Sequence, residues 1–152
     1  MIPQPLNKGG FARNDNPGII LLSKIFSPKI ILHVEGALLL LASAFFYARL
    51  DGNWLMFALL FFVPDVSIAG YLINPAVGAV TYNLAHAYYL PAILAAYGLL
   101  APSSFAISLA LIWFAHAGFD RLLGFGLKYP TRFQDTHLNR VDRKSTRLNS
   151  SH

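Results

Sequence analysis

Four long apolar stretches, separated by short polar turns, occupy most of this 152-residue chain. A membrane-spanning helix needs about 20 mostly apolar residues, and each stretch is long enough to form one. Turn signals such as Asn74-Pro75 end the stretches, and the short connections favour antiparallel neighbours. The pattern therefore predicts an all-α fold, an up-down bundle of four transmembrane helices. The predicted spans are residues 30–50, 54–73, 76–100 and 105–127.

A short apolar run, residues 19–26, precedes the first span and is too brief to cross a membrane. We predict that it forms an interfacial helix, with Lys24 and Lys29 reaching the lipid headgroups. Residues 142–152 read DRKSTRLNSSH, which resembles the translation of a sequencing adapter, so we exclude them from the fold. The predicted divisions are a polar tail with the interfacial segment (1–28), a transmembrane domain (29–127), a polar juxtamembrane segment (128–141) and the adapter-like tail (142–152).

The composition agrees with a membrane environment, because 55% of the residues are hydrophobic and only 12% are charged. Soluble domains contain roughly twice that charged fraction, about 25%. The absence of cysteine excludes disulfides, thiolate nucleophiles and sulfur ligands for metals. The basic residues form no patch interleaved with aromatic residues, so nucleic-acid binding is not expected. Lysine and arginine instead gather at one side of the spans, which predicts a multi-pass protein of the bacterial inner (cytoplasmic) membrane with both termini cytoplasmic.

Every predicted span contains ionisable residues well inside its apolar stretch: Glu35, Asp65, His86, and the pair His116 and Asp120. A charge at the centre of a bilayer costs roughly 2.5–3.5 kcal/mol, so such residues usually face a bundle interior. With a rise of about 1.5 Å per residue, all of them fall at similar depths, nearer the cytoplasmic side. The sequence therefore predicts an intramembrane polar site near that side.

Four of these residues have side chains suited to a divalent metal ion, because they combine carboxylate oxygens with imidazole nitrogens. The candidate metal ligands are Asp65, His86, His116 and Asp120. Glu35 and His137 are the candidate acid/base groups. The candidate supporting polar residues are Asn83, Tyr82, Arg121, Lys128 and Asp135.

The backbone around these residues has its own signals. Pro64 removes an amide donor immediately before Asp65, so the second span should kink there. Gly118 lies between His116 and Asp120 and should let another helix approach closely, as small residues do in membranes. Gly124 and Gly126 should allow tight turning or close packing after the fourth span.

Several motifs together resemble a known family of proteins. They are Val63-Pro64-Asp65, Tyr82-Asn83-Leu84-Ala85-His86, His116-Ala117-Gly118-Phe119-Asp120-Arg121, and Gly126-Leu127-Lys128-Tyr129-Pro130 followed by Asp135-Thr136-His137. The sequence resembles domain of unknown function 4260, a family of short bacterial four-helix integral membrane proteins, over residues 30–141. The resemblance implies a fold and a location, and no activity. A looser likeness, in the order of Pro64-Asp65, His86 and His116…Asp120, is to inner-membrane metal-dependent hydrolases.

Three functions are compatible with an integral membrane protein that has an intramembrane polar site. The first is a metal-dependent membrane hydrolase that acts on a lipid-like or phosphorylated substrate. The second is a small transporter or proton relay, which with four spans would have to act as a homo-oligomer. The third is a structural or partner-binding protein, in which the polar residues hydrogen-bond between helices. In all three the surrounding partner is the lipid bilayer.

Overall fold

The structure is a computed structural model that describes residues 16–130 and residue 136. Every named element in this part is a helix, so the predicted all-α class is confirmed, and the β pairing recorded there is an isolated bridge between Lys128 and Thr136. The adapter-like tail lies outside the described residues. The elements are α1 (Pro17–Ile25), α2 (Pro28–Arg49), α3 (Trp54–Phe61), the 3-10 helix η1 (Val63–Leu72), α4 (Pro75–His86), α5 (Tyr89–Leu100) and α6 (Ser104–Leu122).

Within the described residues, three helical segments are long and apolar enough to cross a membrane. They are Pro28–Arg49, Trp54–Leu72 and Ser104–Leu122, of which the second combines α3 and η1. Leu38, Leu41 and Phe45 on α2 are more than half exposed. A soluble protein rarely exposes so continuous an apolar surface, whereas a bilayer would cover it.

Several helices begin where the sequence supplies a capping side chain. The Asn53 side chain accepts hydrogen bonds from the amides of Leu55 and Met56, and the Asn74 side chain accepts one from the amide of Val77. These side chains satisfy amides that the first turn of a helix leaves without partners. The turn signals between the apolar stretches therefore act as helix N-caps.

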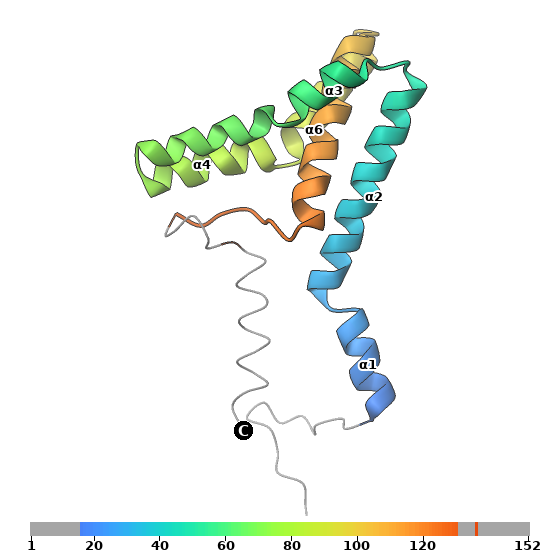
Figure 1. Ribbon diagram of the computed structural model, residues 1–152, viewed down its shortest axis with the longest axis vertical. Coiled ribbons are helices and arrows are strands. Elements are labelled where there is room, and N and C mark those ends of the chain that lie inside the picture. The colour runs from blue at the N-terminus through green and yellow to red at the C-terminus, as the bar shows by residue number, and fades with distance from the viewer. Residues whose placement is uncertain (1–15, 131–135, 137–152) are drawn as a thin grey trace, which may run out of the picture.

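The predicted third span, residues 76–100, is not a single helix. α4 and α5 contain 12 residues each, and the backbone between them is extended at Ala87. Pro91 explains the break, because proline clashes with the carbonyl group four residues earlier but is tolerated in the first turn of a helix. The predicted up-down bundle of four transmembrane helices is therefore not confirmed. Instead, η1 and α4 form a hairpin that extends sideways from α2 and α6 (Figure 1).

The predicted fourth span also ends earlier than expected, at Leu122 rather than at residue 127. Gly124 adopts a φ of 84°, in the left-handed region where a glycine commonly terminates a helix. The Phe125 amide then donates to the Asp120 carbonyl at 2.7 Å. The tight turn predicted at Gly124 is confirmed, and it directs residues 125–128 back toward the η1–α4 hairpin (Figure 1).

Helices α2 and α6 lie side by side because two glycines remove side chains from their contact (Figure 1). A Cβ atom added to Gly36 would lie 2.7 Å from the Gly118 carbonyl oxygen, and one added to Gly118 would lie 2.8 Å from the Gly36 carbonyl oxygen. The close approach predicted at Gly118 is therefore confirmed. One turn before Gly36, His33 Nδ1 lies 2.6 Å from the Leu122 carbonyl oxygen, so this ring nitrogen donates to the end of α6.

Gly36→Ala is expected to destabilise the protein by about 1–3 kcal/mol, the usual cost of overpacking. The added methyl group would meet the backbone nitrogen of Leu122 at 2.6 Å, and backbone atoms cannot move aside as the end of a flexible side chain can. Thermal unfolding in detergent, followed by circular dichroism, measures the effect. Gly18→Ala is the matched control, because its new methyl group would meet nothing closer than the Asn16 side chain at 3.3 Å. Equal melting temperatures for Gly36→Ala and the native protein would contradict this account of the contact.

The kink predicted at Pro64 is confirmed as a change of helix type. α3 ends at Phe61, and the chain continues as the 3-10 helix η1 from Val63. The Asp65 amide then donates to the Phe62 carbonyl three residues earlier, at 3.1 Å. Further along the hairpin, the Thr81 hydroxyl of α4 donates to the Ser67 carbonyl at 2.9 Å. The kink thus fixes Asp65 on the first turn of a helix that packs along α4.

Candidate metal centre

The four candidate metal ligands converge, and three separate elements supply them. Asp65 comes from the first turn of η1, His86 is the last residue of α4, and His116 and Asp120 lie one turn apart on α6. Each residue offers one donor atom, and these four atoms all lie within 4.8 Å of one another. A group of donors this compact can surround a single ion.

The separations between donor atoms are short and similar to one another. His86 Nε2 lies 3.1 Å from His116 Nε2, 3.4 Å from Asp65 Oδ1 and 3.5 Å from Asp120 Oδ2. His116 Nε2 lies 3.6 Å from Asp65 Oδ1. In a tetrahedral zinc site with ligand bonds of about 2.0–2.1 Å, neighbouring ligand atoms lie about 3.4 Å apart. The distances between the donor atoms are therefore close to those between the ligand atoms of a metal site.

The protonation of His86 suits a metal ligand. Its Nδ1 lies 2.8 Å from the Tyr82 carbonyl oxygen, and a carbonyl oxygen only accepts, so Nδ1 carries the proton. In the neutral ring, Nε2 then bears a lone pair that is directed into the cluster. Metal-bound histidines commonly have this arrangement, in which a hydrogen bond at the other nitrogen fixes the orientation of the ring.

Tyr82 supports two members of the cluster at once. Its hydroxyl donates to Asp120 Oδ2 at 2.9 Å, and its ring stacks on His86 with a centroid distance of 3.8 Å and an interplanar angle of 12°. The stacking follows from helical spacing, because Tyr82 precedes His86 by one turn of α4, whereas the hydrogen bond joins α4 to α6. Tyr82 was predicted as a supporting residue, and the structure brings it against the cluster.

The four side chains differ in their exposure to solvent. The His86 and His116 side chains are 1% exposed, whereas the Asp65 side chain is 38% exposed. Asp65 and Asp120 both line a pocket of about 420 Å³, which also touches the C-terminal end of α6 and the segment after it. A small molecule therefore reaches the cluster from the carboxylate side, while the histidines close the other side.

Lys128, another predicted supporting residue, lines the same pocket and is itself buried. The Asn83 side chain holds its backbone in both directions, because the amide group donates to the Lys128 carbonyl at 2.8 Å and the amide oxygen accepts from the Lys128 amide at 2.7 Å. The ammonium group lies 4.1 Å from the centroid of the Tyr82 ring. Burial lowers the pKa of Lys128 to about 8, and the negative charges of Asp120 and Asp65 oppose this shift. The ammonium form thus predominates at pH 7.

The remaining predicted site residues have other positions. Arg121 is buried beside the cluster, where its guanidinium donates to the Phe125 carbonyl at 2.8 Å and so holds the turn after α6. Glu35, by contrast, is exposed on α2 and is not part of the cluster, so the structure does not bring this predicted acid/base group to the other candidate residues. It shares a depth with the other residues, but α2 contacts α6 through Gly36, which directs the neighbouring Glu35 elsewhere. Asp135 and His137 lie outside the described residues.

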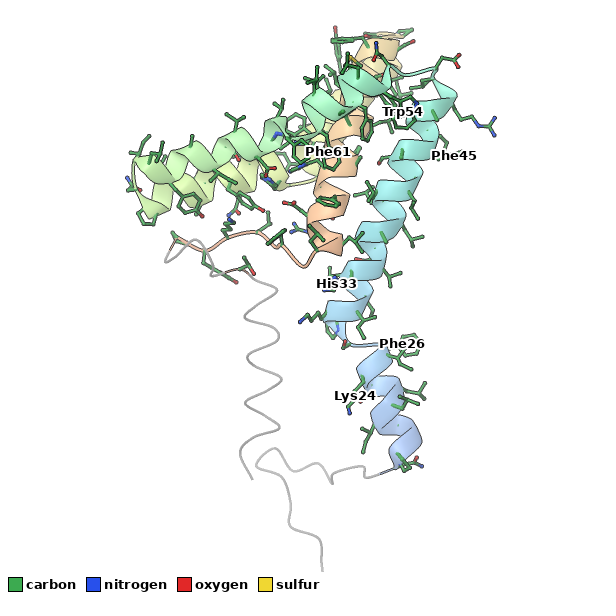
Figure 2. The ribbon with its side chains drawn as sticks, in the orientation of Figure 1. Lys24, Phe26, His33, Phe45, Trp54 and Phe61 are labelled. Carbon is green, nitrogen blue, oxygen red and sulfur yellow. The ribbon has the colours of Figure 1, made fainter. Side chains whose placement is uncertain are left out.

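Two aromatic residues that the sequence analysis did not single out complete the surroundings. Phe61, at the end of α3, packs edge-on against the His116 ring with a centroid distance of 5.3 Å (Figure 2). Trp113 donates from its indole nitrogen to the Ala85 carbonyl at 2.6 Å, next to His86. A signal for Trp113 exists in the sequence, because it precedes His116 by three residues and so lies on the same face of α6.

Comparison with known proteins places the chain in a family. No curated protein and no solved structure matches it. The family described as "Domain of unknown function (DUF4260)" matches residues 29–141, which is most of the chain and includes all four clustered residues. The match agrees with the resemblance carried by the Pro64-Asp65, Asn83…His86 and His116…Asp120 motifs. The chain therefore belongs to the family of domain of unknown function 4260.

Proposed function

We propose that this chain is an integral membrane protein in which Asp65, His86, His116 and Asp120 bind one divalent metal ion that serves in ester hydrolysis. The observation that carries the proposal is the convergence of four donor atoms, from η1, α4 and α6, within 4.8 Å. Here one histidine nitrogen faces three other donor atoms at 3.1–3.5 Å.

The charges of the cluster support the same interpretation. Asp65 and Asp120 both lie within 3.6 Å of a histidine Nε2, and the His86 ring directs a lone pair rather than a proton at them. Two carboxylates gathered around a lone pair repel one another, and burial strengthens the repulsion. One divalent cation offsets two negative charges and accepts all four lone pairs. Imidazole and carboxylate together favour Zn²⁺, Fe²⁺ or Mn²⁺.

The position of the pocket favours catalysis over a purely structural ion. Structural zinc sites are closed, whereas catalytic sites keep a position for water or substrate. Asp65 is 38% exposed and lines the 420 Å³ pocket, so the ligand shell is open on that side. An ion bound there would acidify a water molecule to a pKa near 7 and make it a nucleophile at neutral pH.

The chain's own residues would orient this chemistry. Tyr82 holds the Asp120 carboxylate by its hydroxyl and the His86 ring by stacking, so both ligands keep their orientation while a substrate binds. Phe61 and Trp113 cover the histidine side and exclude water there. Asp65, the ligand open to the pocket, is the carboxylate best placed to take a proton from the attacking water.

The location is part of the proposal. The three segments long enough to cross a membrane support an integral membrane protein, and the basic residues near the N-terminus and after α6 support cytoplasmic termini in a bacterial inner membrane. In this orientation the pocket at the end of α6 faces the cytoplasmic half of the bilayer.

Metal analysis of the purified protein tests the proposal. Protein in detergent is dialysed against Zn²⁺ or Mn²⁺, and the bound ion is measured by inductively coupled plasma mass spectrometry. We expect one ion per native chain, and less than a tenth of that in His86→Ala and in His116→Ala.

His33→Ala is the matched control, because His33 hydrogen-bonds the end of α6 and does not belong to the cluster. It should retain one ion per chain. Less than a tenth of an ion on the native chain, or equal binding by His116→Ala and His33→Ala, would rule out this metal centre. Retention of the ion without hydrolysis of any phosphate or carboxylate ester would rule out the hydrolase.

A further inference from the structure

The pocket beside the cluster has one charged wall and one apolar wall, and the two walls together indicate the chemical class of its ligand. We infer that the ligand is an amphiphile with a phosphate ester headgroup, and that Lys128 binds the phosphate. The inference rests on the proposed function, because the phosphate would lie between Lys128 and the ion. Asp65, Asp120 and Lys128 form the charged wall, and Phe119, Leu123 and Phe125 belong to the apolar one.

The charges around the pocket favour an anion once the metal site is filled. A divalent ion offsets the charges of Asp65 and Asp120, and Lys128 adds a positive charge to the lining of the same pocket. Lys128 is buried against Tyr82 and Tyr71, with its ammonium group 4.1 Å and 5.6 Å from the ring centroids. The protein thus places an ammonium group in an apolar setting beside two metal ligands, where its attraction for an anion is poorly screened.

Hydrogen bonds to the backbone of Lys128 fix the position of this residue at the pocket. Asn83 holds the Lys128 amide and carbonyl, and Lys128 pairs with Thr136, which also lines the pocket. The motif that resembles the family contains both sides of this contact, Asn83 before His86 and Lys128 before Tyr129. Helix α4 therefore supplies both a proposed metal ligand, His86, and the residue that positions Lys128, Asn83.

The apolar wall indicates that the ligand has a hydrocarbon part. Leu123 and Phe125 line the pocket, and they are 52% and 51% exposed. The wall therefore continues onto a surface that a bilayer would cover. An alkyl chain that lies along Leu123 and Phe125 would remain in a hydrocarbon environment while its headgroup enters the pocket.

A phosphate ester fits this arrangement better than a carboxylate ester. A phosphate group carries charge on several oxygens, so one can bind the ion while another contacts the Lys128 ammonium. A carboxylate ester is neutral at the bond that breaks and makes no use of the lysine. In the reaction, a water oxygen forms a bond to phosphorus and the bond from phosphorus to the alcohol oxygen breaks. Asp65 would take the proton lost by the water and pass it to the departing alkoxide, which gives a lipid alcohol and phosphate.

Binding of dodecyl phosphate tests the inference. Equilibrium dialysis at pH 7, in nonionic detergent, measures the dissociation constant for native protein with and without Mn²⁺. We expect Lys128→Met to weaken binding at least tenfold under both conditions and Lys128→Arg to restore most of it. Inorganic phosphate should bind at least tenfold more weakly than dodecyl phosphate, because it lacks the chain.

Lys24→Met is the matched control, because Lys24 is exposed on α1 and its loss changes the net charge equally. It should leave binding unchanged. With Mn²⁺ bound, the phosphorus relaxation of dodecyl phosphate should be faster than in Lys128→Met. An affinity of Lys128→Met within twofold of the native value, or equal binding of dodecyltrimethylammonium, overturns the inference. If no metal binds but dodecyl phosphate still depends on Lys128, the ligand class stands and the hydrolase fails.

Discussion

Addition of Zn²⁺ or Mn²⁺ at a thousand times its dissociation constant should raise the free energy of unfolding by about 4 kcal/mol. The reason is that the four ligands meet only in the folded chain. Asp65 and Asp120 lie on different helices and are brought together by the η1–α4 hairpin and its contact with α6. An ion that binds the folded state and not the unfolded one shifts the equilibrium toward folding by its full binding free energy.

Chemical or thermal unfolding in detergent, with and without excess ion and then with chelator, measures this gain. The chelator should remove it, and His116→Ala should show none. His33→Ala should show the gain of the native protein even if its own baseline stability is lower, since the comparison is made within each variant. An ion-dependent gain below about 1 kcal/mol in the native protein, or a full gain in His116→Ala, would be incompatible with the four-residue metal centre.

Tyr82→Phe should weaken metal binding by 10- to 100-fold, the usual effect of losing a group that orients a ligand. The variant removes only the hydroxyl that donates to Asp120 Oδ2 at 2.9 Å. The phenyl ring still stacks on His86, so the packing of α4 stays intact. The lost hydrogen bond leaves the Asp120 carboxylate free to rotate away from the cluster.

Competition between the protein and a calibrated chelator gives the two affinities, and circular dichroism checks that the fold is kept. Tyr97→Phe removes a hydroxyl from an exposed tyrosine on α5 and should leave the affinity unchanged. A Tyr82→Phe affinity within a factor of two of the native value would show that Tyr82 packs beside the centre without supporting it.

The sequence predicted those features that depend on neighbouring residues. The turn signal at Asn74-Pro75 coincides with a helix boundary, because the Asn74 side chain accepts a hydrogen bond from an amide only three residues away. The change at Pro64 follows from a missing amide, and the turn at Gly124 follows from the left-handed backbone conformation that glycine allows. His116 and Asp120 share a face because four residues make about one helical turn. The family resemblance also came from such local motifs, and the match over residues 29–141 confirms it.

The sequence indicates the depth of a residue within its span better than it indicates the direction of its side chain. Asp65, His86, His116 and Asp120 were grouped by their depth within the spans, and they do lie within 4.8 Å of one another. Glu35 was grouped with them for the same reason, but it is exposed on α2. Depth along a helix follows from counting residues, whereas the direction of a side chain around the axis depends on which neighbour that helix packs against.

Only the tertiary structure decided how the helices are arranged. The sequence determined the helices, their capping residues and the four donor side chains, since each of these depends on residues within about one turn. The sideways η1–α4 hairpin and the return of Lys128 to the pocket depend on contacts between distant segments. Such contacts involve a choice among many pairings of similar apolar faces, and packing at Gly36–Gly118 and the Asn83–Lys128 hydrogen bonds makes that choice.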